Sequence, residues 1–149
     1  MRAVVQRVKE ARVAVDGTVR ASIGKGLCVL VGVEAGDGMD DVNYIAAKLA
    51  AMRIFEDDGG KMNRNVTEAG GAMMIVSQFT LLGDLRKGRR PSFGNAEAPE
   101  KARELYDSLI TAVRQGGITV EGGEFQAHME VGLVNDGPVT LLLDSRKLV

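Results

Sequence analysis

The residues best suited to do chemistry stand at the end of an apolar segment, where Ser77, Gln78, Phe79 and Thr80 follow AMMIV. Polar side chains in a buried strand must find hydrogen-bond partners, because an unpaired buried polar group costs stability. In a regular strand, alternation puts Ser77 and Phe79 on one face and Gln78 and Thr80 on the other. All four could line one pocket only if the strand ends, bulges or bends there. The cluster is therefore either a satisfied structural feature or part of a substrate site.

A second polar segment, NDGPVT, stands between two apolar segments near the C-terminus. Asn, Asp, Gly and Pro build turns, so a plain turn is the simplest interpretation. A cis bond before the proline is the alternative, and few X-Pro bonds in folded proteins are cis. The candidate residues of this segment are Asn135, Gly137, Pro138, Val139 and Thr140.

A long segment, residues 83–98, follows the first polar cluster and carries Arg86, Lys87, Arg89 and Arg90 within five positions. Loops longer than about 12–15 residues in a compact domain are often functional. The four cations either form a solvated loop or bind RNA phosphates, since Arg and Lys make most such contacts. Their nearness to the SQFT cluster in the sequence favours the second interpretation.

The scarcity of histidine and cysteine excludes several kinds of active site, since His128 and Cys28 are the only ones in the chain. A zinc site usually draws on several such ligands, so no metal is expected. A Ser-His-Asp triad would have to use His128, which begins a strand-like segment and is more simply structural or exposed. Cys28 lies inside the apolar run LCVLVGV, where a buried, unreactive thiol is expected.

Two further loops lack the pattern of a ligand site. Residues 24–26 (GKG) precede a strand, whereas a phosphate-binding loop follows a strand and opens a helix. Residues 56–60 (EDDGG) lack the spacing and the closing Glu of an EF-hand, so they predict a turn. We therefore expect the protein to work without a cofactor.

The spacing of apolar residues predicts the elements that must position these groups. One helix is predicted over residues 39–53, and another starts at Pro99 and stops before Gly116. Strands are predicted over residues 3–15, 18–23, 27–33, 72–82, 118–121, 128–134 and 139–144. Two strands, two strand–helix units and three strands predict an α/β domain with two helices on a mixed sheet. Seven strands in so short a chain could also make two stacked sheets.

Composition indicates one folded domain over residues 1–149, with 45% apolar and 26% charged residues. No apolar run approaches the ~20 residues of a membrane helix, so no membrane partner is expected. The charged N-terminal segment does not look like a signal peptide, and a cytoplasmic protein is expected. The net charge of −1 argues against general nucleic-acid binding, DNA included, so an RNA contact needs a local patch.

Together, the two polar segments resemble the signature motifs of the D-aminoacyl-tRNA deacylase family: SQFTLL at residues 77–82 and NDGPVT at residues 135–140. The similarity runs over nearly the whole chain. It includes VDGTV at residues 15–19, RIFEDDGGKMNRNV at 53–66 and RKGRRPSF at 86–93. Two separated motifs in the right order are far more specific than either alone, and neither departs from the family's pattern.

The resemblance implies a homodimer with a three-layer α/β/β fold, and the 3′ end of an aminoacyl-tRNA as its substrate. In the family the Gly-Pro bond is cis. Here Gly137-Pro138 would project from one subunit into the partner's site, beside Ser77, Phe79 and Thr80. Its carbonyl groups would reject an L-amino acid by a rigid clash, while a D-side chain would point into solvent. Glycine, for example mischarged on tRNA-Ala, would also be accepted.

Two mechanisms stay open for the ester hydrolysis that the resemblance implies. Thr80 Oγ could attack as a nucleophile, although the sequence shows no obvious base for it. Alternatively, backbone N–H groups near Phe79 and Thr80 hold the developing oxyanion, and the ribose 2′-OH of the tRNA helps to activate water. We prefer the second mechanism because it needs no side-chain base.

Three other functions compete with this interpretation. A non-catalytic RNA-binding module would rely on basic faces and stacking aromatic residues, yet the chain has only four Phe, two Tyr and no Trp. A serine esterase of the α/β-hydrolase type would carry a G-x-S-x-G motif, which does not occur. A related editing hydrolase with relaxed chirality remains open.

Overall fold

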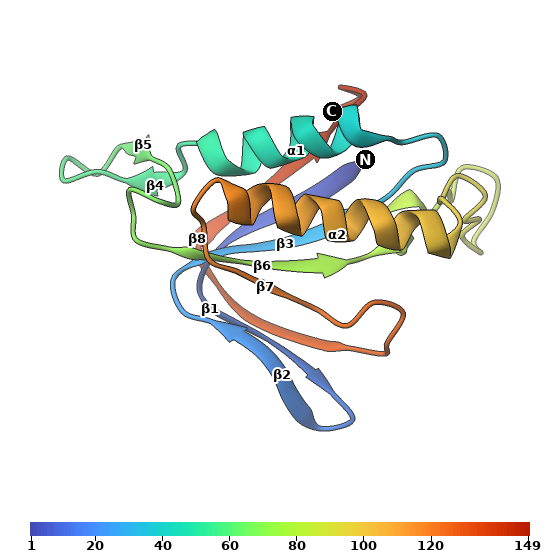
Figure 1. Ribbon diagram of the computed structural model, residues 1–149, viewed down its shortest axis with the longest axis horizontal. Helices are drawn as coiled ribbons and strands as arrows, with labels where there is room; N and C mark the ends of the chain where they lie inside the picture. The colour runs from blue at the N-terminus through green and yellow to red at the C-terminus, as the bar shows by residue number, and fades with distance from the viewer.

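The computed structural model describes residues 1–149 and has two helices on one face of a six-stranded sheet (Figure 1). The sheet runs in the order β2-β1-β3-β6-β7, and β8 pairs with β1. The β3–β6 and β6–β7 pairs are parallel and the other pairs antiparallel, so the predicted mixed sheet is confirmed. The bounds of its strands are β1 Arg2–Val15, β2 Thr18–Ile23, β3 Gly26–Gly32, β6 Ala72–Ser77, β7 Val120–Gly122 and β8 Glu130–Asp144.

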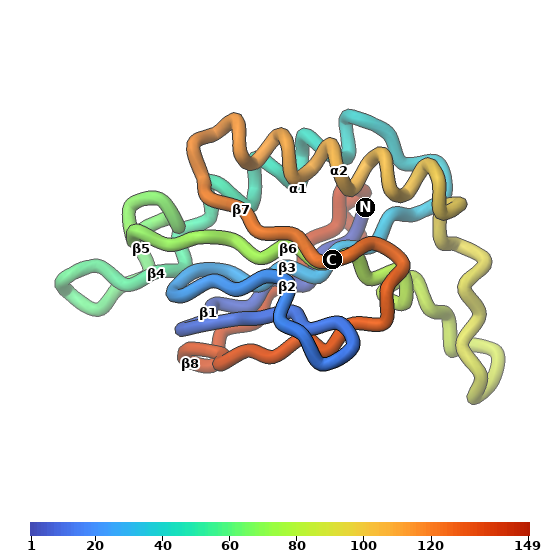
Figure 2. Tube along the Cα trace, turned by 60° about the horizontal axis from the view of Figure 1, so that its bottom comes forward, coloured from blue at the N-terminus to red at the C-terminus, as the bar shows by residue number.

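The long strand β1 belongs to two layers. Its first half pairs with β3 and its second half with β2, so β2 and β3 follow one another along the same edge. Asp16 and Gly17 have positive φ angles of 50° and 76°, which suits the tight turn between β1 and β2. In Figure 2 the helices lie above β6 and β3, and β1 and β8 lie below them.

Two hydrophobic cores confirm the three-layer arrangement. A core of 22 buried residues fills the space between the helices and the sheet. A second core of eight lies on the other face, where Val13 of β1 and Ile23 of β2 join Met74 and Val76 of β6. Cys28 is buried in this second core, as its apolar neighbours predicted. The sheet therefore bends far enough to bury both faces of its central strands.

The helices form where apolar residues recur at helical spacing. In α1 (Met39–Ala51) the buried residues are Val42, Ile45 and Leu49, and in α2 (Pro99–Gln115) they are Leu105, Tyr106, Leu109, Ile110 and Val113. Burying a Leu or Ile side chain fully contributes about 1.5–3 kcal/mol, so these stripes hold the helices to the sheet. Pro99 stands in the first turn of α2, as predicted. Neither α1 nor α2 combines the length and the apolar character that a membrane-spanning helix requires.

Two predictions about strands were wrong, and one small hairpin was missed. The strand expected over residues 72–82 ends at Ser77, and the chain continues as a 3-10 turn, η1 (Phe79–Leu82). The strands expected over 128–134 and 139–144 are one strand, β8, with an irregularity inside it. A small hairpin of β4 (Phe55–Glu56) and β5 (Met62–Arg64) was not predicted, because segments this short carry no readable alternation.

Candidate active site

The first motif lies at the point where β6 leaves the sheet. Ser77 still pairs with Val31 of β3, and the Gln78 N–H donates to the Val31 carbonyl at 2.7 Å. Leu82 is buried and packs over Gly32, so the chain must turn inward instead of extending the strand. The condition for gathering SQFT at one place, that the strand ends there, is thus fulfilled.

A pocket of about 540 Å³ opens beside this turn. Ser77, Gln78 and Phe79 form one wall. The other walls come from the start of α2 and from the segment before β8: Ala96, Glu97, Pro99, Ala102, Tyr106, Phe125, Gln126, Ala127, His128 and Met129. A mostly apolar hollow with a few polar groups at its edge is the usual form of a small-ligand site.

Thr80 has no base beside it. Its hydroxyl accepts a hydrogen bond from the Gln78 side-chain amide, and the residue is exposed and does not line the pocket. No carboxylate or imidazole bonds to Thr80 Oγ1 in the structure. In contrast, the amides of Phe79 and Thr80 open the 3-10 turn, and the first N–H groups of such a turn have no acceptor within it.

Tyr106 fixes the floor of the pocket. Its buried hydroxyl donates to the Ile75 carbonyl at 2.6 Å and accepts from the Gly123 N–H at 3.2 Å. Burial raises the pKa of Tyr106 to about 12, so the phenol stays neutral near pH 7. Tyr106 thereby joins β6, α2 and the chain after β7 at the floor of the pocket.

The long loop after η1 lies against the first motif. Asp84 and Ser92 form an isolated bridge, and the Phe93 ring meets the Phe79 ring edge-on with 5.1 Å between centroids. The Arg86 guanidinium forms an ion pair with the Asp84 carboxylate at 2.7 Å, and the Arg86 backbone N–H also donates to that carboxylate. Hydrogen bonds from Arg86 lower the pKa of Asp84 to about 2. Lys87, Arg89 and Arg90 are exposed at the end of a loop that projects from the molecule (Figure 2).

The second motif is a bulge within β8. Gln6 pairs with Thr140, and Val8 pairs with Asn135. Two residue steps along β1 therefore lie opposite five residue steps along β8, and the extra residues of β8 form the bulge. The Asn135 side chain spans the bulge, accepting from the Val139 N–H at 2.7 Å and donating to Thr140 Oγ1 at 2.9 Å. The Gly137-Pro138 bond is cis, and both residues are exposed at the surface.

Arg7 ties this bulge to the core. Its side chain is almost completely buried, and it donates to the Asp136 carbonyl at 2.9 Å and to the Ile54 carbonyl at 2.8 Å. A guanidinium that bonds two carbonyls fixes their relative positions, because its donors are coplanar. The exposed Gly137-Pro138 pair therefore stands on a rigid base.

The two motifs lie apart within one chain. Arg2, at the start of β1, contacts the carbonyl end of η1, whereas Gln6 and Val8 face the bulge. At roughly 3.3 Å per residue, the motifs are about 13–20 Å apart along β1. No residue of the bulge lines the pocket. A single chain does not bring SQFT and NDGPVT together.

Comparisons with known proteins agree with the two motifs. The family model described as D-Tyr-tRNA(Tyr) deacylase matches residues 4–144. The chain is 59% identical to a D-aminoacyl-tRNA deacylase of Anaeromyxobacter dehalogenans, covering 99% of each chain. It is 54% identical to one of Heliobacterium modesticaldum, covering 98% of this chain and 97% of the other. The chain belongs to the D-aminoacyl-tRNA deacylase family, a family of hydrolases.

Two solved structures show the same fold as this deacylase-family chain. One, described as c-Myc DNA Unwinding Element Binding Protein, has a TM-score of 0.91 and 37% identity, covering 97% of this chain and 98% of that one. The other, described as a probable eukaryotic D-amino acid tRNA deacylase, has a TM-score of 0.79 and 18% identity over 95% and 97% of the chains. At that identity the second match supports the fold alone.

Several pocket residues of this family member were missed in the sequence. Glu97, Tyr106, Phe125 and His128 come from three separate segments, and no spacing links them. The sequence places Tyr106 only within the second predicted helix, and it favours a structural or exposed His128. His128 is indeed exposed, but it stands at the pocket wall. These residues come together only when the chain folds around the end of β6, so no local sequence pattern could have identified them.

Proposed function

We propose that this protein hydrolyses the ester bond between a D-amino acid and the 3′ end of tRNA, releasing the free amino acid and the tRNA. The observation that carries the proposal is the SQFT turn, whose leading amides stand beside a pocket and whose Thr80 hydroxyl is bound by no carboxylate or imidazole. Family membership supports the same reaction. Such an activity would serve translation in the cytoplasm, where charged tRNA is used.

The pocket is the proposed seat of the terminal nucleoside of the tRNA. Its volume of about 540 Å³ falls in the range of small-ligand sites, and Phe125 offers an aromatic face for a base. Ser77 and Gln78 would then stand beside the ribose, so the aminoacyl ester would lie over the amides of Phe79 and Thr80.

The two amides would stabilise the developing negative charge. Water attacks the ester carbonyl carbon, the carbonyl oxygen becomes an oxyanion held by the Phe79 and Thr80 N–H groups, and the ribose oxygen leaves with a proton. One such donor contributes about 3–4 kcal/mol to the transition state. The neighbouring 2′-OH of the ribose would help to activate the water, since no carboxylate or imidazole bonds to the Thr80 hydroxyl.

The chiral filter is proposed to come from a second copy of the chain, since the bulge and the pocket of one chain lie apart. β8 pairs with β1 alone and carries exposed Val134, Leu141 and Leu142, so this edge suits an apolar contact with another copy. In a two-fold dimer each bulge would reach the partner's site. The carbonyls of Gly137 and Pro138 would then exclude an L-side chain while admitting D-amino acids and glycine.

The exposed cations of the long loop are proposed to contact phosphates of the tRNA acceptor end. Lys87, Arg89 and Arg90 are not bound to carboxylates, whereas Arg86 is held by Asp84. The packing of Phe93 on Phe79 places this loop next to the SQFT turn, so phosphates near the ester could reach it.

Matched substrates test the proposal. D-tyrosyl-tRNA and glycyl-tRNA should be hydrolysed rapidly and L-tyrosyl-tRNA spared. Equal release of D- and L-tyrosine would keep the hydrolase but remove the chiral role of Gly137-Pro138. If the protein binds all three substrates and releases nothing, a non-catalytic binding module is the better description.

A Thr80→Ala variant separates the two mechanisms. With the oxyanion held by backbone amides, the variant should keep kcat within about fivefold of the unmodified protein, since a neutral hydrogen bond contributes only about 1 kcal/mol. Complete loss of D-tyrosine release, with an unchanged melting temperature, would instead identify Thr80 Oγ as the nucleophile.

A further inference from the structure

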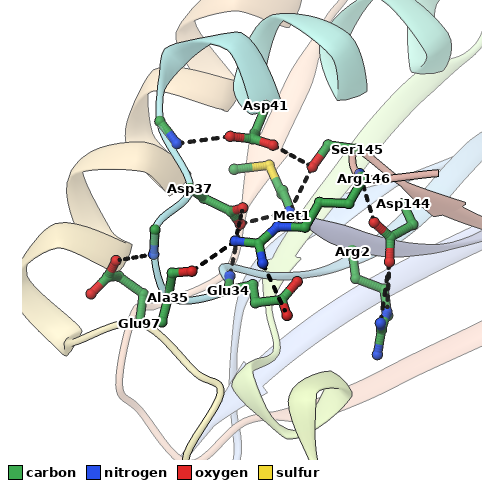
Figure 3. A network of polar contacts seen from close by, with 12 residues as sticks. Met1, Arg2, Glu34, Ala35, Asp37, Asp41, Glu97, Asp144, Ser145 and Arg146 are labelled. Atoms are coloured by element: carbon green, nitrogen blue, oxygen red, sulfur yellow. Dashed lines mark hydrogen bonds and ion pairs between the residues drawn. The ribbon is translucent and has the colours of Figure 1, made fainter. Parts of the chain in front are cut away.

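Arg2 links the SQFT turn to the buried end of β8. Its guanidinium donates from Nε and Nη2 to Asp144 Oδ2, at 3.2 and 3.1 Å, and from Nη1 to the Leu81 carbonyl at 3.2 Å. The Asp144 side chain is fully buried, and its second oxygen accepts from the Arg146 N–H at 2.8 Å. Figure 3 shows Arg2 beside Asp144, at the edge of a wider polar network.

The geometry of arginine makes this contact directional. The donors of a guanidinium lie in one plane, so two bonds to a fixed carboxylate also fix where the third donor points. Asp144 is such a carboxylate, because it is buried and held by the backbone. Arg2 therefore presents Nη1 to one position, and the Leu81 carbonyl occupies it.

The other restraints on the SQFT turn act at its two ends and on one ring, since the Phe79 ring packs edge-on against the Phe93 ring. Gln78 is bonded to Val31 before the turn begins, and Leu82 is packed on Gly32 where it ends. Phe79 between them is 57% exposed. Arg2 binds the Leu81 carbonyl near the C-terminal end of this four-residue turn. Any shift of this end changes the direction of the amides at the other end.

We propose that Arg2 is a positioning residue for the hydrolysis, acting through the Leu81 carbonyl to aim the amides of Phe79 and Thr80 at the ester. The proposal rests on the proposed oxyanion role of those amides. Arg2 does not line the pocket, so it sets the rate of the chemical step and not the affinity for the tRNA. Misalignment of reacting groups by about 1 Å can cost about 10²-fold in rate, and a loosened turn should cost part of that.

Two replacements of Arg2 and one control separate positioning from stability. Arg2→Met keeps the apolar stem and loses both contacts. Arg2→Lys can still pair with Asp144 but lacks the planar fork that reaches Leu81. Arg146→Met is the matched control, because Arg146 pairs with Glu34 and Asp37 of the same network and does not touch the turn.

Three measurements are made on each variant with D-tyrosyl-tRNA: kcat, KM and the melting temperature. We expect Arg2→Met to lower kcat about tenfold with KM within twofold of the unmodified protein, as for a lost transition-state contact. In Arg2→Lys the melting temperature should recover while kcat stays low. In Arg146→Met the melting temperature should fall with kcat unchanged. An unchanged kcat in Arg2→Met, or an equal fall in Arg146→Met, would overturn the proposal.

Amide hydrogen exchange over residues 78–84 tests the contact between Arg2 and the Leu81 carbonyl independently of the hydrolysis reaction. Exchange should rise in Arg2→Met and stay unchanged in Arg146→Met. If it does not rise, Arg2 does not hold the turn and the proposal fails, while the proposed hydrolysis is untouched. If it rises and kcat stays the same, the turn is held but its amides do not serve the reaction, which overturns both the positioning role and the oxyanion mechanism.

Discussion

The two signature motifs are held in different ways. The SQFT turn is anchored at its ends, by Gln78 on Val31 and by Leu82 over Gly32, and its middle is exposed next to a pocket. The NDGPVT bulge is braced from within, by the Asn135 side chain and by the almost completely buried Arg7. One motif borders the pocket in its own chain, whereas the other projects from the surface and contributes no residue to that pocket.

The difference is what each proposed task requires. A group that stabilises charge on a substrate must share a cavity with it, and its backbone amides must stay free. A group that excludes one enantiomer must resist displacement, because a soft obstacle would yield to the wrong side chain. The braced, exposed bulge suits the second task. The SQFT turn suits the first, because it borders the pocket and the amides at its start have no acceptor within the turn.

The largest expected effect is that of Gly32→Ala, beneath the SQFT turn. A Cβ there would lie 2.5 Å from Leu82 Cδ2 and 2.9 Å from the Gln78 carbonyl oxygen, so the turn must move. Such overpacking costs about 1–3 kcal/mol of stability. We expect kcat for D-tyrosyl-tRNA to fall about a hundredfold, as for misplaced reacting groups. Gly88→Ala, in open space on the long loop, is the control. If kcat of both variants stays within threefold of the unmodified protein, the turn tolerates displacement and the prediction is wrong.

Gly137→Ala should have a smaller and more selective effect at the other motif. A Cβ there would lie 2.8 Å from Val139 Cγ2 and 3.1 Å from the Val139 nitrogen, at a φ of 137° that costs an L-residue about 1–3 kcal/mol. We expect the ratio of D- to L-tyrosine release to fall about tenfold, because a displaced Gly137-Pro138 would exclude the L-side chain less well. A tenfold fall corresponds to a loss of about 1.4 kcal/mol in discrimination between the enantiomers. A ratio that is unchanged in a folded variant would remove the bulge from chiral selection.

Replacing Lys87, Arg89 and Arg90 together by Ala should change binding without changing selectivity. Each lost phosphate contact lowers the slope of log KM against log salt concentration by about 0.7–0.9. The slope should therefore flatten while kcat and the D-to-L ratio stay constant. A control replacing the exposed Lys9, Arg20 and Lys61 alters net charge equally and should leave most of the slope. If the slope flattens equally in both variants, the long loop contributes to tRNA binding only through the general surface charge.

The smallest effect is expected at Cys28, in the core between the two regions. Burial raises the pKa of the Cys28 thiol to about 11, so at pH 8 it stays protonated as well as inaccessible. Iodoacetamide at pH 8 should leave the folded protein unlabelled and should label it fully in denaturant. Rapid labelling of the native protein would mean that the third layer opens, and with it the common support of both motifs.

The sequence predicted the helices, the mixed sheet and the three layers because these follow from apolar spacing and from the resemblance. It placed the end of the strand at residue 82 because AMMIVSQFTLL contains no Gly, Pro, Asn or Asp. The deciding contact, Leu82 over Gly32, joins two segments that are distant in the sequence. Similarly, NDGPVT looks like a turn by composition. Whether it becomes a turn or a bulge depends on Gln6 and Val8, its partners on β1.

The pocket could not be predicted for the same physical reason. Phe125 and His128 reach the SQFT turn only because the chain after β7 crosses the end of β6, where the Tyr106 hydroxyl binds it. The role of Arg7 was also hidden, since a cation in a strand usually points to solvent, and only the carbonyls of Ile54 and Asp136 justify its burial.

The placement of the two motifs at separate points along β1 has a genetic consequence. If each site combines the turn of one subunit with the bulge of its partner, a chain defective only in the turn and a chain defective only in the bulge can rescue each other. Their mixed dimer contains one site with both defects and one with neither. Random pairing of equal amounts would make about half the dimers mixed. About a quarter of all sites would then be both active and selective, from one allele that lacks activity and one that lacks selectivity.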